Sequence, residues 1–188
     1  MKMIAINGSP RKDGRTSEAI VAMTAAAEEK GYEVERFDLA SLAFKDCLGC
    51  KECDISGRCV QDDDMSILYD RILEADHLFM ASPIYMGSET GVFNCFIDRL
   101  YALLEPVGDG KFTSRIPEGK AATAMMVSGS PDGHIIYHYL TNRLTSIFKG
   151  LFGIEDFASF IVPGMNRLES ITESVSYKQN FEVFQERL

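Results

Sequence analysis

Four of the five cysteines lie close together in the sequence and form a candidate site for a soft metal centre. They follow the pattern Cys-x2-Cys-x2-Cys-x5-Cys, formed by Cys47, Cys50, Cys53 and Cys59. Gly49 and Gly57 lie inside the pattern, and glycine lets the backbone turn tightly enough for ligands at three-residue spacing to converge. The first hypothesis is therefore that the thiolates hold one compact inorganic group containing iron and sulfur.

Other roles for these cysteines remain open. Zinc usually prefers two Cys-x2-Cys pairs held apart by a long spacer, and that spacer is missing here. The spacing is closer to the cubane-binding run of bacterial ferredoxins, although the last interval is longer and Val60 follows the fourth cysteine in place of proline. Free or redox-active thiols are a further alternative. A disulfide framework is disfavoured, because the N-terminus does not look secretory and the chain is large enough to fold around its own core.

A second candidate site follows the first apolar run. Residues 2–7 read as a buried strand, and residues 8–17, Gly-Ser-Pro-Arg-Lys-Asp-Gly-Arg-Thr-Ser, combine hydroxyls, glycines and basic groups in front of a helix. Backbone N–H groups and the helix dipole at such a helix start favour a phosphate. Ser9, Thr16 and Ser17 supply hydrogen-bond donors, and Arg11 adds positive charge. The alternative is an ordinary solvated turn. Neither Gly-Lys-Ser/Thr nor Gly-x-Gly-x-x-Gly is present, which disfavours a nucleotide triphosphatase.

Two more turns follow predicted strands. Residues 82–90 include the apolar and aromatic residues Pro83, Ile84, Tyr85 and Met86 before Gly87, and a flat ring system could rest on them. Tyr85 and Met86 are also compatible with ordinary core positions. Residues 128–133 form a turn of small residues that begins with Ser128 and Gly129, where a ligand could approach the backbone closely. Three such turns together favour a mononucleotide site.

The remaining reactive side chains are interpreted as structural, and no general acid is assigned. His77 begins a strand, whereas His134 and His138 lie in a helical pattern. Cys95 is expected to be a small core residue. The acidic run Asp62–Asp64 is expected to be a solvated helix start, and Asp98 and Arg99 are expected on a helix surface.

Strands and helices alternate along the chain. Strands are expected at 2–7, 32–39, 77–82, 120–127 and 155–162. The first helix is expected to begin with Thr16 or Ser17 as its cap and to end before Gly31; others are expected at 64–75, 89–104, 135–152 and the C-terminus. Parallel strands need such crossovers, so the pattern predicts an α/β fold with helices on both faces of a parallel sheet. Five strands favour the flavodoxin-like order 2-1-3-4-5 over a dinucleotide-binding order, with ligands at the carboxyl ends of the strands.

Composition restricts the alternatives. The 188 residues fit one domain, and 46% hydrophobic residues suffice for a substantial core. The net charge of −9 disfavours nucleic acid as a partner. No apolar stretch approaches a membrane span and no signal peptide is evident, so a cytoplasmic location is expected, with no membrane partner.

These motifs together resemble the NAD(P)H-dependent FMN reductase family, and specifically its iron–sulfur flavoprotein branch. The resemblance rests on Gly8-Ser9-Pro10-Arg11 with Gly14 and Thr16-Ser17, on the cysteine array, on Asp62-Asp63-Asp64-Met65, and on Ser82-Pro83-Ile84-Tyr85. It covers residues 1 to about 165. It implies a single flavodoxin-like FMN-binding domain over residues 1–188, with a cysteine-rich loop at 45–60.

The resemblance also implies ligands. It places the phosphate of FMN on Ser9, Arg11, Gly14, Thr16 and Ser17, and the isoalloxazine ring on Pro83, Ile84, Tyr85, Met86 and Gly87, with Ser128 and Gly129 on the far side. It implies a [4Fe–4S] cluster on Cys47, Cys50, Cys53 and Cys59, although relatives with a similar cysteine run are not all known to carry one. It further implies a homodimer or homotetramer with the flavin site near a subunit interface.

The resulting functional hypothesis is an FMN-dependent oxidoreductase that passes electrons between FMN and the cluster. NAD(P)H is the expected donor, and a redox protein or a small molecule is the expected acceptor. Two alternatives are retained: a cluster-free NAD(P)H-dependent FMN or quinone reductase, and a flavodoxin-type electron carrier without substrate turnover. A zinc-stabilised binding module is a more distant one. The sequence does not distinguish NADH from NADPH, because it contains no separate dinucleotide fingerprint.

Overall fold

A five-stranded parallel sheet forms the centre of the protein in the computed structural model, which describes residues 1–131 and 135–188. The strand order is β2-β1-β3-β6-β7, which confirms the predicted order 2-1-3-4-5. The strands are β1 (Lys2–Asn7), β2 (Glu33–Asp38), β3 (His77–Pro83), β6 (Ala121–Val127) and β7 (Asp156–Val162). Each predicted strand agrees with the structure to within one residue at either end, because apolar runs mark buried parallel strands clearly.

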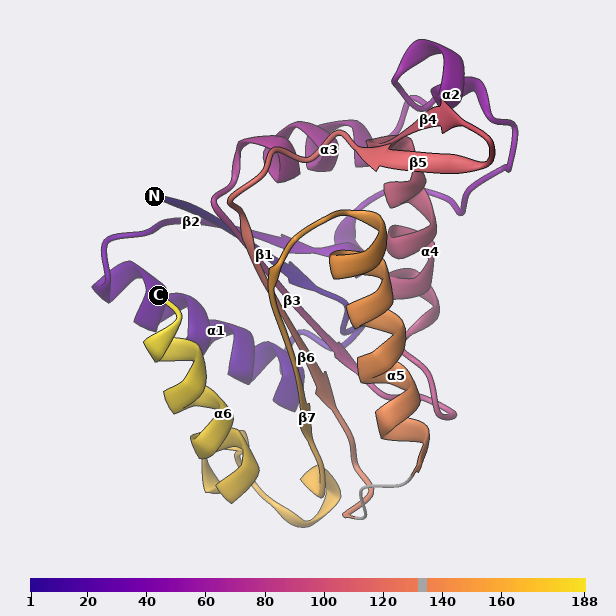
Figure 1. Cartoon of the computed structure of the whole chain (residues 1–188). Coiled ribbons are helices and arrows are strands. Elements are labelled where there is room, and N and C mark those ends of the chain that lie inside the picture. The colour runs from indigo at the N-terminus through magenta and orange to yellow at the C-terminus, as the bar shows by residue number, and fades with distance from the viewer. Residues whose placement is uncertain (132–134) are drawn as a thin grey trace.

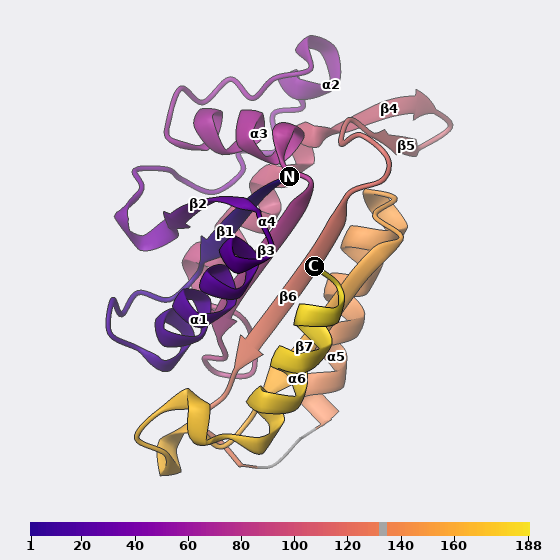
Figure 2. The same ribbon diagram turned by 90° about the vertical axis from the view of Figure 1, so that its left-hand side faces the viewer.

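Helices cover both faces of this sheet (Figures 1 and 2). One layer consists of α1 (Arg15–Glu29) and α6 (Val175–Glu186), and the other of α3 (Met65–Glu74), α4 (Gly91–Arg99) and α5 (Ile135–Thr145). The pleat of each strand explains the two cores, since successive side chains point to opposite faces. In β1, Ile4 and Ile6 pack toward α3, α4 and α5, whereas Met3 and Ala5 pack toward α1 and α6.

Three helix predictions need correction. The first helix begins at Arg15 with Gly14 at its N-cap, so Thr16 and Ser17 lie within its first turn and do not cap it. The helix predicted over 89–104 begins at Gly91, capped by Thr90, and after Arg99 tightens into a 3-10 turn over Leu100–Leu103. The predicted helix 135–152 likewise consists of α5 followed by a π-helical stretch, Ser146–Leu151.

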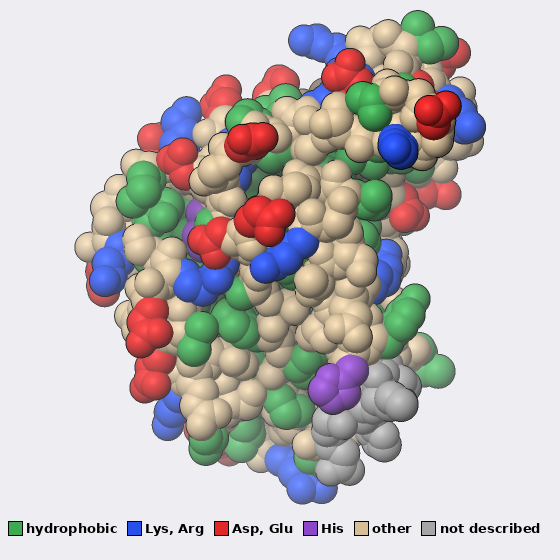
Figure 3. Space-filling model, in the orientation of Figure 1, with side chains coloured by type: hydrophobic (Ala, Val, Ile, Leu, Met, Phe, Trp, Pro, Cys, Tyr) green, Lys and Arg blue, Asp and Glu red, His purple; other side chains and the backbone are tan. Residues whose placement is uncertain are grey.

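A separate element was not predicted. β4 (Leu104–Gly108) and β5 (Lys111–Ser114) form an antiparallel hairpin beside the short helix α2 (Glu52–Ser56) of the cysteine-rich segment. Both elements lie at the end of the molecule where α4 ends, and this end projects from the body and carries hydrophobic and charged side chains together (Figure 3). The described residues include no helix long and apolar enough to cross a membrane.

Candidate functional site

A cavity of about 520 Å³ lies at the carboxyl edge of the sheet, where residues following four different strands meet. It is bordered by Ser9, Arg11, Gly14 and Thr16 after β1, by Pro83, Ile84 and Tyr85 at β3, by Gly129 after β6, and by Met165, Asn166 and Leu168 after β7. The sequence-predicted loops therefore meet around one space. Their role in binding a cofactor remains a prediction.

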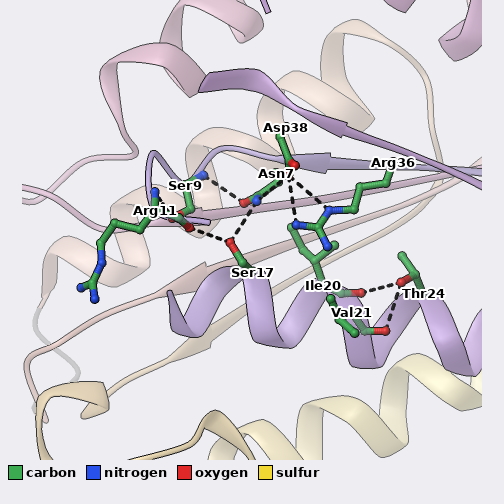
Figure 4. Close-up of polar contacts among 9 residues, drawn as sticks. All are labelled: Asn7, Ser9, Arg11, Ser17, Ile20, Val21, Thr24, Arg36 and Asp38. Carbon is green, nitrogen blue, oxygen red and sulfur yellow. Dashed lines mark hydrogen bonds and ion pairs between the residues drawn. The ribbon is translucent and has the colours of Figure 1, made fainter. Parts of the chain in front are cut away.

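Asn7, at the last position of β1, organises the predicted phosphate loop, residues 8–17. It is 1% exposed, and its Nδ2 donates to Ser17 Oγ at 3.0 Å and to Asp38 Oδ1 at 2.8 Å. Its Oδ1 accepts from the backbone N–H of Ser9 at 3.0 Å. Figure 4 shows this network joining the end of β1, the start of α1 and the end of β2. Asn7 was missed in the sequence because it closes an apolar strand and belongs to no motif.

The two serines of this loop shape its backbone. Ser17 Oγ donates to the carbonyl of Arg11 at 2.8 Å, and Ser9 Oγ donates to the same carbonyl at 3.2 Å. The Arg11 side chain is exposed, and Figure 4 shows its guanidinium directed away from these hydroxyls. The N-cap residue Gly14 provides no side-chain hydrogen bond to the first turn of α1. A helix start without a side-chain cap leaves backbone donors and a partial positive charge for an anion, so the cavity fits a phosphate group.

The loop after β3 is fixed to the phosphate loop through Thr90. Thr90 Oγ1 donates to the carbonyl of Gly8 at 2.7 Å and accepts from the backbone N–H of Phe93 at 3.3 Å, while the Thr90 N–H donates to Ser82 Oγ at 3.1 Å. Gly8 is constrained by the same packing, because a Cβ there would lie 2.7 Å from Phe93 Cδ2. The apolar residues Pro83, Ile84 and Tyr85 therefore lie beside a rigid support at the start of α4.

Met86 and Gly87 form the tip of a tight turn in this loop. Tyr85 and Ser88 exchange backbone hydrogen bonds of 2.8 and 3.1 Å, and both tip residues have positive φ, 50° at Met86 and 82° at Gly87. Left-handed backbone favours glycine and is uncommon for methionine. Met86 is fully exposed, and neither tip residue borders the cavity, whereas Pro83, Ile84 and Tyr85 do. The turn presents Met86 to any ligand that extends beyond the cavity.

The far side of the cavity combines predicted and unpredicted residues. Gly129 borders it, whereas Ser128 is buried and hydrogen-bonds to the Tyr137 hydroxyl. The backbone N–H groups of Met165 and Asn166 donate to the carbonyls of Ser128 and Gly129 at 2.9 and 3.3 Å. Residues 165–168 were not predicted to border the cavity, because tertiary contacts with the loop after β6 place them there. The turn predicted over 128–133 lies partly outside the described residues.

The four clustered cysteines border a second cavity, of about 430 Å³, at the opposite end of α4. Cys53 is buried on α2, Cys59 is half-buried, and Cys47 and Cys50 are exposed. All four are free thiols. Burial raises the pKa of Cys53, with further increases from Asp54 and from Cys59 and Cys47. The thiols of Cys47, Cys53 and Cys59 therefore lie close enough for their charges to interact.

Left-handed turns shape this loop, as the glycines predicted. Gly49 and Gly57 have φ values of 64° and 73°, and Lys51 also has a positive φ of 62°. The Gly49 N–H donates to Cys47 Sγ at 3.4 Å. Within residues 1–131 and 135–188, no three His, Cys, Asp or Glu side chains are close enough together to hold a metal ion. The donor set and shared cavity suit a thiolate-bound group, which must draw the loop inward to be coordinated.

Arg99 corrects the prediction of an exposed helix residue. It is 2% exposed, borders the cysteine cavity, and makes a bidentate ion pair with Asp63 at 2.7 and 2.9 Å. Burial tends to raise the pKa of Asp63, but the hydrogen bonds and charge of Arg99 outweigh it and hold that pKa below its usual value. Asp64 accepts from the backbone of Ala43, so this acidic run is not simply a solvated helix start. Asp98 is exposed, as predicted.

The other structural predictions are resolved individually. Cys95 is half-buried, and burial raises its pKa, with Asp46 and Asp98 adding to the effect. His77 is fully buried and bonds through Nε2 to Thr123 Oγ1 at 3.0 Å, which confirms a structural role. His138 is exposed, and His134 lies outside the described residues.

The sheet order, with loops from successive strands around a cavity at its carboxyl edge, defines a flavodoxin-like α/β protein. A solved NAD(P)H:quinone oxidoreductase from Methanothermobacter marburgensis superposes with a TM-score of 0.77 and 18% identity, covering 100% of this chain and 99% of that one. An FMN-dependent NADH-azoreductase from Bacillus anthracis, solved with FMN, gives a TM-score of 0.67 and 13% identity, covering 100% and 97%. At sequence identities this low, the similarity shows that this chain shares their fold and nothing about its activity.

Residues 1–153 match the sequence profile of the family described as NADPH-dependent FMN reductase. The chain therefore belongs to the NADPH-dependent FMN reductase family.

Curated relatives at higher identity are named iron–sulfur flavoproteins. One from Archaeoglobus fulgidus is 40% identical over 100 residues, which cover 53% of this chain and 46% of that protein. One from Clostridioides difficile is 35% identical over 108 residues, covering 56% and 48%. A third, from Methanocaldococcus jannaschii, is 29% identical over 168 residues, covering 85% and 81%. The chain thus matches about half the length of the first two.

Proposed function

We propose that this protein is an FMN-dependent oxidoreductase that passes electrons between FMN and a [4Fe–4S] cluster held by Cys47, Cys50, Cys53 and Cys59. The observation that carries the proposal is the gathering of all four thiols around one cavity in a chain of the FMN reductase family. The names of the iron–sulfur flavoprotein relatives support it. Bound FMN supplies hydride acceptance and one-electron release, and the cysteine-bound cluster supplies one-electron transfer.

The chain contributes position and environment to this chemistry. The first turn of α1 offers backbone donors to the phosphate, and Pro83, Ile84 and Tyr85 offer a surface for the flavin ring. The network centred on Asn7 holds the phosphate loop in shape. Burial of Cys53 and the left-handed turns at Gly49 and Gly57 orient the thiol ligands.

A homodimer or homotetramer is part of the proposal. Within one chain, Thr90 supports the flavin loop and Arg99 borders the cysteine cavity, so the two sites lie at opposite ends of α4. The nine residues of α4 span roughly 13 Å along the helix axis, which separates the two sites. A neighbouring subunit that brings its flavin close to the cysteine cavity would shorten the electron path. Light scattering on the purified protein measures the assembly state.

NAD(P)H is proposed as the donor, and a redox protein or a small molecule as the acceptor. A specific observation keeps the cluster-free FMN or quinone reductase as a second candidate: Cys47 and Cys50 are exposed, and among the described residues no three thiols lie close enough together to hold a metal ion. The flavodoxin-type carrier would differ in oxidising nicotinamide cofactors slowly while exchanging electrons rapidly with a protein partner.

The flavin, iron, zinc and acid-labile sulfide contents of protein purified without oxygen test the proposal. We expect flavin absorption with a broad shoulder at about 400 nm, and about four irons with matching acid-labile sulfide per chain. Flavin without iron or zinc would favour the cluster-free reductase or the carrier, and zinc without sulfide would assign the cysteines to a zinc site. Failure to bind added FMN would overturn the main proposal.

A further inference from the structure

Both ends of the cysteine-rich loop are attached to one buried guanidinium at the end of α4. Arg99 Nη1 donates to the backbone carbonyl of Lys45, just before Cys47, at 2.8 Å. The Nη1 and Nη2 groups also donate to the two carboxylate oxygens of Asp63, which follows Cys59, at 2.7 and 2.9 Å. All four clustered cysteines lie between these two attachment points.

Further contacts hold the arginine and close the loop beside it. The Tyr69 hydroxyl donates to the Arg99 carbonyl at 3.0 Å and accepts from its Nε at 3.3 Å, so α3 fixes the guanidinium. Gln61 Nε2 donates to the Asp46 carbonyl at 3.0 Å, which joins the beginning and the end of the loop a second time. Since the planar fork of arginine matches a carboxylate at two points, lysine cannot reproduce the arrangement.

We propose that Arg99 is a positioning residue for the cysteine site, which closes the base of loop 45–63 and keeps the four thiols around one cavity before a metal group binds. The inference deepens the proposed cluster site, and its first test needs no metal. A loop already closed at its base has less chain entropy to lose when its ligands converge, so Arg99 increases metal retention without contacting the metal. Asp63 neutralises the guanidinium, and the role is therefore mainly mechanical.

Two variants separate this role from general stability. Arg99→Lys keeps the charge but loses the fork. Arg99→Met combined with Asp63→Leu removes both charges, so no buried charge is left unpaired; such apolar replacements of buried ion pairs are often tolerated. The matched control is Arg143→Lys. Arg143 pairs at 2.8 Å with the buried Glu89, near the other end of α4, and touches neither end of the cysteine loop.

Hydrogen–deuterium exchange on the full chain stripped of iron measures loop closure directly. Loss of charge-assisted bonds predicts roughly ten- to a hundredfold faster exchange within loop 45–63 for both Arg99 variants, and little change in the central sheet. The control should leave this loop unchanged. Unchanged exchange in the Arg99 variants, or an increase spread evenly over the sheet, would overturn the proposal.

Iron release provides the second readout. In protein purified without oxygen, we expect a chelator to remove iron several-fold faster from both Arg99 variants than from the Arg143→Lys control. Equal release rates would refute a role for Arg99 in metal retention. Wild-type protein that holds no iron would refute the proposed cluster, while the exchange result would still decide whether Arg99 closes the loop.

Discussion

The two cavities at opposite ends of α4 are built in different ways. The cavity at the sheet edge lies between strand ends joined by backbone hydrogen bonds, and buried Asn7 and Thr90 connect its loops. The cysteine cavity lies under a long loop attached to Arg99 at its base and to Tyr101 at α2, with two of its four thiols exposed. A binding site on a sheet edge is formed before its ligand arrives, whereas a site on a long loop needs its ligand to complete it.

The largest expected effect is loss of metal without loss of flavin. Cys50→Ser removes one soft ligand from the proposed cluster, and we expect iron content to fall from about four per chain to a small fraction of that. FMN binding should persist, because Cys50 does not border the sheet-edge cavity. Iron assay and flavin titration measure the two sites independently. Cys95→Ser is the control, since Cys95 lies outside the array. Loss of FMN together with iron would show that the two sites are not separable.

A substitution beside the cavity at the carboxyl end of the sheet should affect the flavin site and leave the cysteine site intact. Asn7→Ala removes three hydrogen bonds and leaves buried partners unsatisfied, which should lower the free energy of unfolding by about 2–3 kcal/mol and weaken FMN binding at least ~10-fold. Denaturant unfolding and flavin titration provide the measurements.

Thr24→Ala is the matched control for Asn7→Ala, because Thr24 Oγ1 bonds only to carbonyls of its own helix. Its expected effect on unfolding is below ~0.5 kcal/mol, as for most surface substitutions. Flavin affinity equal to wild type in the Asn7 variant would contradict the view that Asn7 shapes the phosphate loop.

Both cavities depend on one cooperatively folded domain. The pH dependence of unfolding tests this through His77. Burial lowers the pKa of His77 from 6.5 to about 4, with Arg187 adding to this effect, and its Nδ1 has no hydrogen-bond partner. Between these values the unfolded chain binds a proton that the folded chain does not, so stability falls as the pH falls. From pH 7 to 5 we expect a loss of about 2 kcal/mol.

Urea unfolding at several pH values measures this dependence. In His77→Leu the contribution of this residue to the pH slope should vanish, whatever the change in absolute stability. His138→Gln should retain the slope, because His138 is exposed. A slope unchanged in the His77 variant would assign the acid sensitivity to other groups.

The smallest expected effect concerns the segment after β7. Glu18 on α1 accepts from the Ser170 hydroxyl and from the Ile171 N–H at 3.2 Å, which secures the segment that carries Met165 and Asn166 to the cavity. Glu18→Gln should weaken these bonds, costing about 1 kcal/mol of stability and about threefold in FMN affinity. Glu28→Gln, an exposed position on the same helix, is the control. Flavin affinity reduced equally by both substitutions would exclude a specific effect of Glu18.

Sequence patterns predicted the sheet and the meeting of its loops because apolar runs and turn residues are local signals. Arg99 was misread because a charge at the end of a helix usually faces water. Its spacing from Phe96 and Phe93 nevertheless placed it on the buried face. The hairpin was missed although Gly108-Asp109-Gly110, a turn signal, separates Val107 from Phe112. The contributions of Met165 and Asn166 depend on tertiary contacts that no local pattern encodes.

The central claim is that electrons pass between the two sites, and stopped-flow reduction of a one-electron acceptor tests it most directly. Wild type and Cys50→Ser, both loaded with FMN and prepared without oxygen, are mixed with NADH or NADPH and a one-electron acceptor. We predict that flavin reduction proceeds at similar rates in both proteins, while acceptor reduction is at least ~10-fold slower in the variant. Acceptor reduction at the wild-type rate in Cys50→Ser would contradict electron transfer through the cysteine site.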